Sequence, residues 1–423
     1  MRILYTLIWI LALPLVLARL YARARKEPGY RQHIGERFGR YTGAPSVEPM
    51  IWIHAVSVGE TRAAEPLIRQ LTEIWPQHRI LLTHMTPTGR ATGTMLFQDE
   101  LRSNRLVQCY LPYDIPFLIN RLIRHFKPVI CILMETEVWP NLIYTCHQQA
   151  IPVALVNARL SPKSLKKAQR MPGLIRPASA ALTCVAAQTA SDAQRIAQLG
   201  APRVVVTGNS KFDVSVPAEK ITAGDALRAH WGARKVLLCA STREGEEELI
   251  LDAFLKAGQK DLLLLIVPRH PQRFDQVEQL LQQRQIPMLR KSRLDQNPVP
   301  AQVQVVLGDT MGEMASYYVS CDLAFIGGSL LRLGGQNLIE ACAVAKPVLI
   351  GPHTFNFDAI STDAINADAA IRIGDPAELF DKVSALMADD TRRLAMGQNA
   401  LAFARLHRGA TARTVALLEE LMQ

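Results

Sequence analysis

Short apolar runs that alternate with longer segments of helical period constrain the fold of this 423-residue chain more than any other feature. Runs such as VICIL (129–133) and LLLLIV (262–267) show no polar alternation, so each predicts a strand that is covered on both faces of its sheet. Strands that alternate with helices predict parallel sheets of βαβ units, and therefore an α/β fold. The candidate strands are 50–55, 79–83, 105–111, 129–134, 152–156, 182–187 and 204–207 in a first series, and 236–240, 262–267, 303–307, 322–327 and 347–351 in a second.

Polar and turn residues interrupt the series at 208–219, and the chain is long enough for two domains. We therefore predict two doubly wound domains, over 23–212 and 213–423, after an apolar segment at 1–22. Ligands of such sheets bind at the carboxyl ends of the strands, so we expect two facing domains with a shared cleft. Apolar spacing predicts a final helix over 413–421, which by analogy with two-domain enzymes of this class packs back on the first domain.

The N-terminal segment predicts a membrane anchor. Residues 3–18 are almost wholly apolar, interrupted only by Thr6 and Pro14, which is short of the twenty or so residues that span a bilayer. The segment either spans, with Arg19 snorkelling, or lies in the interface. A cleaved signal peptide is disfavoured because 22–24 is a poor cleavage site.

Positive charge follows the anchor directly. Eight Arg and Lys against two Glu in the first forty residues supply +6 of the formal net charge of +10. This bias predicts a cytoplasmic location for the body and attraction to an anionic membrane surface. The excess belongs to one end of the chain, and aromatic residues are only 6%, so a nucleic-acid-binding groove is disfavoured.

The cysteine pattern and several missing motifs exclude other classes of site. The seven cysteines include no CxxC pair and predict reduced core thiols in a cytosolic compartment. A GxxxxGK[ST] phosphate loop, a GxSxG elbow and an HExxH motif are absent from the sequence. No DxD follows an apolar strand, so we predict no metal for the binding of a diphosphate.

Four loops in the first half carry candidate residues. Glu60 ends HAVSVGE, where it is a candidate general base or a helix N-terminal residue favoured by the dipole. Glu135 lies in METEVWPN, which also suits a helix capped by Thr136. Lys211 in GNSKFD is a candidate partner for a phosphate or carboxylate, or a solvated linker lysine. The loop THMTPTGR suits an anionic ligand but favours a plain β–α turn.

Loops after the strands of the second half are rich in glycine. They are STREGE (241–246), VPRHP (267–271), GDTMGE (308–313), GGS (327–329) and GGQNLIE (334–340). Glycines allow backbone amides to approach a phosphate, Arg269 adds a positive charge, and Glu340 suits a ribose diol. Each loop alone also fits a simple turn, so the prediction depends on their number in one domain.

Together these stretches resemble the 3-deoxy-D-manno-octulosonic acid (Kdo) transferases of lipid A biosynthesis. The matching motifs are GYRQHIGERFGRY, HAVSVGE, THMTPTG, YLPYD, METEVWPNLI, NARLS, GNSKFD, VPRHPQRF, GDTMGEM, FIGGSL and GPHTFNF, in order up to Phe357. The resemblance implies a GT-B fold and inverting transfer of Kdo from the donor CMP-Kdo to a lipid A precursor of the lipid IVA type. It also implies an enzyme at the inner membrane, with its catalytic domains on the cytoplasmic face.

The resemblance also implies roles for individual residues. Glu60 becomes the general base, and Glu135 and Lys211 stabilise the transition state. The CMP-binding residues become Pro268, Arg269, Met311, Gly312, Glu313, Asn337, Leu338, Ile339 and Glu340. No metal is implied at the transfer site. The chain departs from the family's usual GGHNPLE at Gln336 and Leu338.

Three other interpretations remain open at this point. The first is a different GT-B protein, either another lipid-linked glycosyltransferase or a nucleotide-sugar epimerase. The second is a membrane-anchored protein that binds nucleic acid, and the third is an inactive scaffold. Donor competition between CMP and UDP separates the enzymes from one another, and salt-dependent DNA affinity tests the second.

Overall fold

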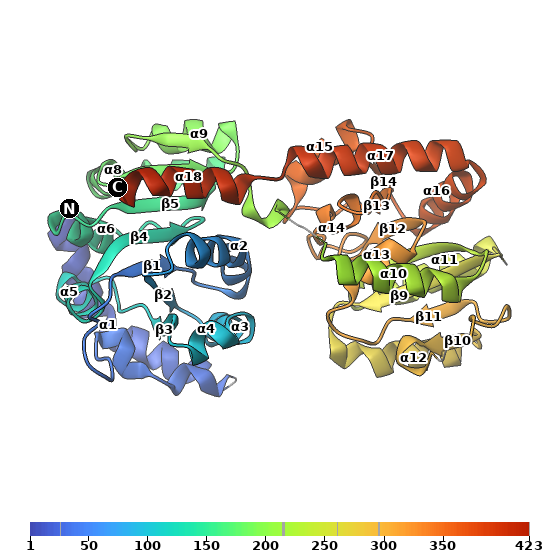
Figure 1. Cartoon of the computed structure of the whole chain (residues 1–423), viewed down its shortest axis with the longest axis horizontal. Coiled ribbons are helices and arrows are strands. Elements are labelled where there is room, and N and C mark those ends of the chain that lie inside the picture. Colours follow the sequence, from blue (N-terminus) through green and yellow to red (C-terminus); the bar gives the residue numbers. More distant parts are fainter. Residues whose placement is uncertain (26, 214–215, 260, 295–296, 423) are drawn as a thin grey trace. The chain divides into compact units, whose positions relative to one another are not determined.

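The computed structural model describes residues 1–25, 27–213, 216–259, 261–294 and 297–422. The chain divides into two compact units. Unit 1 comprises Met1–Asp213 together with Arg408–Gln423, and unit 2 comprises Val214–His407. Each unit is built around a parallel sheet of seven described strands (Figure 1). This arrangement confirms the predicted α/β class with two parallel sheets.

The sheet of unit 1 has the strand order β3-β2-β1-β4-β5-β6-β7, with the first strand in the interior, between β2 and β4. All of its neighbouring strands pair in parallel. The strands are β1 (Met50–His54), β2 (Arg79–His84), β3 (Leu106–Tyr110), β4 (Pro128–Met134), β5 (Val153–Ala158), β6 (Cys184–Ala187) and β7 (Val204–Val206).

Helices cover both faces of this sheet. The α-helices of unit 1 are α1 (Arg2–Arg23), α2 (Val58–Ile74), α3 (Pro87–Leu96), α4 (Gln98–Arg102), α5 (Pro116–Phe126), α6 (Pro140–Gln148), α7 (Pro162–Ala168), α8 (Pro172–Ala180), α9 (Ala190–Ala197) and α18 (Ala410–Met422). Short 3-10 helices are η1 (Pro28–Arg31), η2 (Ile34–Phe38) and η3 (Ser210–Phe212).

Alternate residues of one strand enter two different cores. In β1, Ile51 and Ile53 pack in a cluster with α2 and α18, whereas Met50 and Trp52 pack in a cluster with α5, α6 and α8. Both sets are apolar because neither face of the sheet meets water. This is the physical reason that the strands read as continuous apolar runs, as the sequence predicted.

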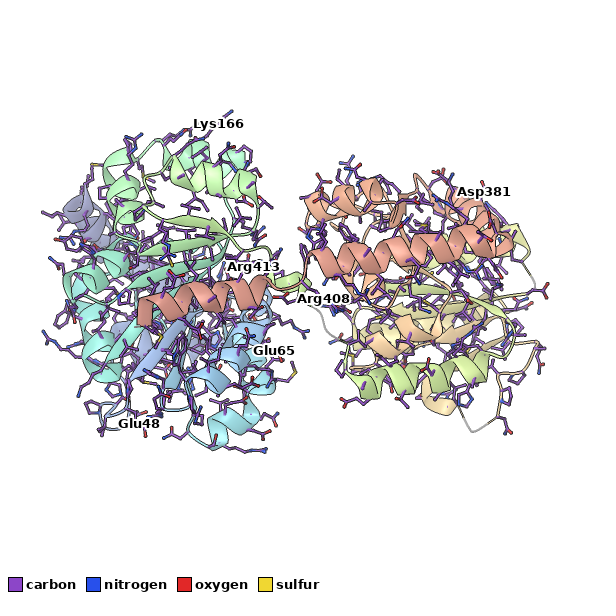
Figure 2. All side chains as sticks on the ribbon, turned by 45° about the horizontal axis from the view of Figure 1, so that its top comes forward. Glu48, Glu65, Lys166, Asp381, Arg408 and Arg413 are labelled. Carbon is purple, nitrogen blue, oxygen red and sulfur yellow. The ribbon has the colours of Figure 1, made fainter. Side chains whose placement is uncertain are left out.

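The final helix belongs to the first of these cores. Val415, Leu417 and Leu418 of α18 are buried in the cluster that contains α2. Figure 2 shows Arg413 on α18, and its guanidinium donates a hydrogen bond of 2.8 Å to the carbonyl oxygen of Thr207. The carboxylate of Asp213 accepts from the backbone amides of Gly409, Ala410 and Thr411, which holds the start of α18. The end of the chain therefore packs in unit 1.

Unit 2 is also a parallel sheet with its first strand, β8, in the interior, but its strand order differs. The order is β10-β11-β9-β8-β12-β13-β14, so β11 lies between β9 and β10. The strands are β8 (Lys235–Thr242), β9 (Leu262–Pro268), β10 (Met288–Arg290), β11 (Val305–Leu307), β12 (Leu323–Ile326), β13 (Val348–Ile350) and β14 (Ala370–Arg372). The helices are α10 (Ala218–Trp231), α11 (Glu246–Ala257), α12 (Phe274–Gln283), α13 (Met314–Ser320), α14 (Ile339–Cys342), α15 (Asp358–Asn366), α16 (Pro376–Ala388) and α17 (Asp390–Leu406), with 3-10 helices η4 (Pro271–Arg273) and η5 (Lys291–Arg293).

The strands β10 and β14 were not predicted. Each has three residues and lies at an edge of the sheet of unit 2. Both end in an arginine, and β10 is only partly buried, so neither gives a continuous apolar run. The cysteines agree with the prediction, because all seven are free thiols and buried.

Candidate active site

The turn after β1 places Glu60 at the start of α2. Ser57 is the N-cap of α2, and its backbone amide donates to Oε2 of Glu60 at 2.9 Å, as in a capping box. The side chain is buried, with the residue only 8% exposed. Burial raises the pKa of the Glu60 carboxyl above its usual value, and the nearby charge of Glu135 raises it further against the opposing bond from Ser57. The contact with Ser57 gives Glu60 a helix-capping role, and its catalytic role stays a prediction.

Glu135 follows β4 and lies between two cations. Its backbone is left-handed, with φ of 54°, and the residue is buried. Oε1 lies 2.6 Å from Nζ of Lys211, and Oε2 accepts from Nε of Arg159 at 3.0 Å. Such partners offset the cost of removing a carboxylate from water. The structure thus brings Glu60, Glu135 and Lys211 together at the carboxyl ends of the strands of unit 1.

A third carboxylate, Glu137, joins this group. Its Oε2 accepts from the indole Nε1 of Trp139 at 2.8 Å. Burial raises the pKa of Glu137 to about 7, and the negative charges of Glu60 and Glu135 add to this effect. The sequence contained the signal for this residue, since both carboxylates of METEVWPN follow one apolar strand, but only Glu135 was assigned a role there.

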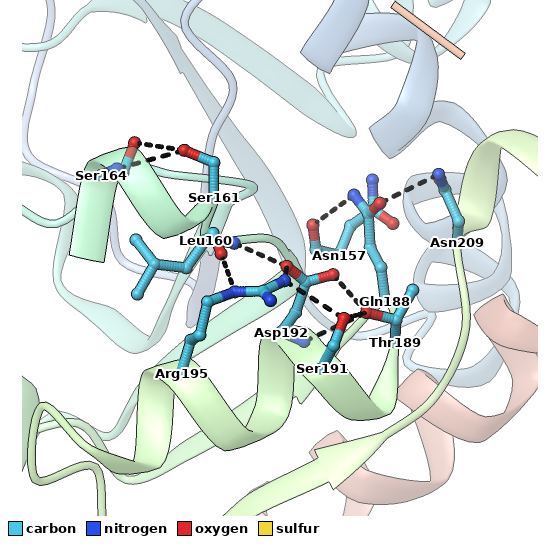
Figure 3. A network of polar contacts seen from close by, with 10 residues as sticks. All are labelled: Asn157, Leu160, Ser161, Ser164, Gln188, Thr189, Ser191, Asp192, Arg195 and Asn209. Atoms are coloured by element: carbon cyan, nitrogen blue, oxygen red, sulfur yellow. Dashed lines mark hydrogen bonds and ion pairs between the residues drawn. The ribbon is translucent and has the colours of Figure 1, made fainter. Parts of the chain in front are cut away.

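Backbone and amide contacts hold Lys211 in position. Asn209 accepts from the amide of Lys211 at 3.0 Å, and its side-chain nitrogen donates to Gln188 at 3.1 Å. Gln188 donates in turn to the carbonyl oxygen of Asn157 at 2.9 Å, and the Oδ1 of Asn157 accepts from the amide of Ser210 at 3.1 Å. Figure 3 shows Asn157, Gln188 and Asn209 of this network, which ties the end of β5 to the residues after β6 and β7. Lys211 is therefore a positioned lysine and not a freely solvated linker residue.

Arg159 was also missed at the sequence level. It follows β5 in the motif NARLS, and its guanidinium is half exposed while its Nε contacts Glu135. A basic residue directly after a buried strand was the available signal. The sequence alone does not link Arg159 to Glu135, because the two are 24 residues apart and meet only through the pairing of β4 with β5.

The loop after β2 is mainly structural. Thr86 caps α3, and Arg90 forms an ion pair of 2.6 Å with Glu36. His54 and His84 are fully buried, and burial lowers their pKa values to about 3 and about 4, so both are neutral at pH 7. This outcome fits the plain turn that the sequence favoured for THMTPTGR.

Unit 2 has a glutamate in the equivalent turn after its first strand. Oε2 of Glu246 accepts from the amides of Arg243 at 2.9 Å and Gly328 at 2.6 Å. Oε1 accepts from the amide of Leu330 at 2.9 Å. Glu246 is fully buried and holds the glycine loop after β12 in place. This cradling role was not predicted from the sequence.

The predicted CMP-binding residues lie after strands of the sheet of unit 2. Pro268 ends β9, and the exposed Arg269 follows with its amide bonded to Thr242 at 2.9 Å. Met311 is 66% exposed, and Gly312 has a φ of 77°. Glu313 pairs with Lys291 at 2.7 Å and with Thr310, and although partial burial opposes ionisation, these bonds hold its pKa below the usual value.

The remaining predicted residues surround the start of α14. Oδ1 of Asn337 accepts from the amide of Ile339 at 3.1 Å, and Leu338 and Ile339 are fully buried. The charges of Glu340 and Arg269 both reach the buried hydroxyl of Tyr318, whose pKa is raised by burial. Leu338, which stands where the family usually has proline, is accommodated in the core of this unit.

Over the described parts of the chain, no group of three or more His, Cys, Asp or Glu side chains is arranged as metal ligands. The prediction of a metal-independent site stays a prediction.

Comparisons with known proteins give a consistent result. A family model described as "3-Deoxy-D-manno-octulosonic-acid transferase (kdotransferase)" matches residues 32–214. A 3-deoxy-D-manno-octulosonic acid transferase from Bordetella pertussis is 44% identical over 416 residues, which cover 96% of each chain. The same enzyme from Haemophilus influenzae is 37% identical over 430 residues, which cover 100% of this chain and 99% of that one.

Solved structures show the fold. A glycosyltransferase from Rickettsia africae has a TM-score of 0.59 at 13% identity, over 89% of this chain and 100% of that one. A UDP-GlcNAc 2-epimerase from Neisseria meningitidis has a TM-score of 0.57 at 16% identity, over 88% of this chain and 100% of that one. These likenesses place the chain in the GT-B fold, as predicted.

Proposed function

The chain belongs to the family of Kdo transferases, and we propose that it moves Kdo from CMP-Kdo to a lipid A precursor of the lipid IVA type. Membership of this family makes it a glycosyltransferase of lipopolysaccharide synthesis. The observation that carries the proposed mechanism is the cluster of Glu60, Glu135 and Lys211 at the strand ends of unit 1.

Glu60 accepts the proton of the acceptor hydroxyl in this proposal. The hydroxyl oxygen attacks the anomeric carbon of Kdo, the bond from that carbon to the phosphate oxygen breaks, and CMP leaves with the electron pair. A base is most effective when its pKa approaches the working pH, and the pKa of Glu60 is raised by burial and by Glu135. The capping bond from Ser57 orients the carboxylate before the acceptor arrives.

Lys211 and Glu135 stabilise the charge that develops during transfer. Glu135 fixes the ammonium of Lys211 at 2.6 Å, and Arg159 approaches the same carboxylate from its other oxygen. A pre-positioned cation needs little reorganisation as negative charge moves to the phosphate or remains on the Kdo carboxylate. Glu135 therefore acts by holding a cation, and Lys211 by contacting the substrate.

The loops of unit 2 hold the donor in this proposal. Arg269 supplies an exposed positive charge, and the glycine loop fixed by Glu246 presents backbone amides. Glu340 accepts hydrogen bonds from the ribose. The contacts of Met311, Gly312, Glu313 and the segment 337–339 complete the CMP site by analogy with the family motifs.

We also assign the enzyme to the inner membrane, with its catalytic units on the cytoplasmic face. The helix α1 is long and apolar enough to cross a membrane, with 22 residues and a mean hydropathy of 2.2. The basic residues that follow favour the cytoplasmic side and anionic lipids as the partner surface. Nucleic acid is not a partner in this proposal.

The direct test is Kdo transfer by the full chain in membranes. CMP-Kdo is generated in place because it is labile, a tetraacyl lipid A precursor serves as acceptor, and the product is identified by mass spectrometry. We expect a product heavier by one or more Kdo units, and the mass also gives the number added. Absence of product from folded protein, together with failure of CMP to bind, contradicts the donor assignment.

A further inference from the structure

The helix α1 has two different faces. One face is partly or fully covered by unit 1 and consists of Arg2, Tyr5, Thr6, Trp9, Leu13, Val16 and Leu20. The opposite face is exposed and apolar, with Ile3, Leu4, Leu7, Ile8, Leu11 and Leu15 each at least 50% exposed. Both sets recur at intervals of three and four residues, as two stripes of one helix.

Polar contacts fix the beginning of α1. The hydroxyl of Tyr5 donates to Oδ2 of Asp114 at 3.0 Å, and Thr6 exchanges a hydrogen bond with Asn141. Asp114 also accepts from the amides of Asn141 at 3.1 Å and Leu142 at 2.8 Å, so it joins α1 to the first turn of α6. The guanidinium of Arg2 lies 3.1 Å from the ring centre of Tyr144, which is on α6.

Apolar contacts fix the middle and the end. Trp9, Leu13 and Val16 pack against Tyr113, Ile115 and Leu118 in one small core. Trp9 and Tyr113 have ring centres 5.9 Å apart. Leu20 is only 8% exposed. A helix of 22 residues is ~33 Å long. Because the contacts run from Arg2 to Leu20, the body of unit 1 lies against most of that length.

A docked helix of this kind is incompatible with a simple transmembrane anchor. If α1 crossed the bilayer in its docked position, α5 and α6 would enter the hydrocarbon with it. If it left the body to cross alone, Asp114 and Asn141 would lose their contacts with Tyr5 and Thr6, and the core around Tyr113 would open. The first alternative places polar groups in the hydrocarbon, and the second exposes apolar side chains of unit 1 to water.

We propose that α1 lies in the plane of the membrane interface, with its exposed apolar stripe in the lipid and its other stripe fixed to unit 1. This inference rests on the proposed function, because that function makes a lipid surface the partner of the exposed apolar stripe. Charge supports the same choice, because the exposed Arg19, Arg23 and Arg25 at the end of α1 complement anionic headgroups.

The arrangement has a consequence for the reaction. The loop that carries Glu135 and Glu137 leads directly into α6, and the first turn of α6 is bonded through Asp114 to α1. An in-plane α1 therefore holds the catalytic cluster of unit 1 at a set height above the lipid. A glycolipid acceptor then reaches that cluster with its acyl chains still in the membrane.

Depth measurement tests the proposal on the full chain. Single variants Leu4→Cys, Leu11→Cys and Leu15→Cys receive an environment-sensitive fluorophore, and the seven native cysteines stay unlabelled because they are buried. The protein binds vesicles of phosphatidylethanolamine and phosphatidylglycerol that contain lipids with quenchers at graded depths. We expect one common shallow depth, ~5–10 Å into the boundary between headgroups and acyl chains.

A spanning helix gives a different pattern, in which Leu4 and Leu15 differ in depth by up to ~16 Å. That result, or a fluorophore that no lipid quenches because protein covers it, overturns the proposal. Glu73→Cys is the matched control, and it should show no quenching, because this exposed residue of α2 belongs to the face of the unit 1 sheet opposite α5, α6 and α8. Depth is independent of transfer, so a shallow common depth without Kdo transfer refutes the proposed function and leaves this inference standing.

A cross-link provides a second test. Trp9→Cys with Tyr113→Cys, joined by a short bismaleimide, fastens α1 to unit 1. An in-plane helix predicts that the linked enzyme still binds vesicles and transfers Kdo at the rate of the unlinked double variant. Loss of vesicle binding only after linking overturns the proposal, because it shows that α1 must leave the body to enter the membrane.

Discussion

The two units contain the same turn with the same glutamate, but in different surroundings. In unit 1 the amide of Ser57 donates to Glu60 at 2.9 Å, and in unit 2 the amide of Arg243 donates to Glu246 at the same distance. Each glutamate lies in the first turn of the helix after the first strand of its sheet, and each sheet has that strand in its interior. The winding of the chain therefore places both side chains in corresponding positions.

The difference lies in what else reaches the carboxylate. Glu246 accepts two further backbone amides and is fully buried, so its oxygens are committed to the fold. Glu60 is near a second carboxylate, Glu135, which raises its pKa. The comparison teaches that a glutamate after the first strand becomes structural where amides surround it, and becomes a candidate base where another negative charge does.

The neighbouring strands show the same contrast. The strand β4, beside β1, is followed by Glu135, whereas β12, beside β8, is followed by Gly327 and Gly328. A Cβ atom on Gly327 would lie 2.6 Å from the carbonyl oxygen of Ser241, so only glycine fits there. Unit 1 thus presents side chains at this edge of its sheet, and unit 2 presents backbone.

Replacement of Glu60 by Gln should have the largest effect. Gln keeps the shape and one accepting oxygen for Ser57, but it cannot take the acceptor proton, so we expect the turnover number to fall by ~10²–10⁴. Initial rates of Kdo transfer and the melting temperature are measured on the same preparation. Glu65→Gln on the same helix is the control and should leave the rate unchanged. Near-normal turnover in folded Glu60→Gln protein refutes the base assignment.

Lys211→Met tests whether the cation of unit 1 serves the reaction. We expect the rate to fall by ~10²–10³, the usual effect of removing one group that stabilises transition-state charge. Lys211→Arg should recover part of the loss because it restores the charge beside Glu135 with a different geometry. Lys163→Met, which removes an exposed lysine of α7, controls for net charge. If Lys211→Met and Lys163→Met lower the rate of Kdo transfer by the same small factor, Lys211 acts only through the net charge of the protein.

Glu246→Gln should affect stability and donor binding instead of the chemical step. The nitrogen of the new side-chain amide must face a backbone N–H of Arg243, Gly328 or Leu330, so two hydrogen-bond donors meet. We therefore expect a loss of ~1–3 kcal/mol in the free energy of unfolding. Denaturant unfolding and CMP affinity are measured beside Glu244→Gln, an exposed neighbour in the same turn. If CMP binding and stability are both unchanged, the glycine loop does not depend on Glu246.

The sequence predicted the class of the fold and most strands because burial on both faces leaves a plain signal. Thus β4 and β9 appear as unbroken apolar runs, whereas β10 and β14 were missed because three residues at a sheet edge give no such run. Bounds shifted by a residue or two at other strands, such as β5, where hydrogen bonding continues through Asn157 to Ala158.

The candidate site was predictable only where one loop carried its own signal. Glu60, Glu135 and Lys211 each follow a strand, and the resemblance to a family assigned their roles. Arg159 and Glu246 needed knowledge of which strands are neighbours. Glu135 is 24 residues from Arg159, and the glycine-loop amides of Gly328 and Leu330 are 82 and 84 residues from Glu246. The faces of α1 were equally hidden, because the polar residues of its covered face lie only near its start, at Arg2, Tyr5 and Thr6, and the rest of that face is as apolar as the exposed one.

Glu137→Gln should give the smallest effect, visible as a change in pH dependence. The folded protein holds the proton of Glu137 up to about pH 7, above the usual value of 4.5, so the stability that this carboxyl contributes is full below pH 4.5 and lost as pH rises through 7. Gln resembles the protonated acid and has no such loss. The melting temperature of the variant minus that of the native chain should therefore be near zero at pH 5 and rise by a few degrees by pH 8, for about 1–3 kcal/mol. Asp99→Asn, at a fully solvated position of unit 1, is the control, and its difference in melting temperature from the native chain should be constant between pH 5 and pH 8. If the difference for Glu137→Gln is constant as well, the crowding of carboxylates that distinguishes unit 1 from unit 2 does not hold a proton at neutral pH.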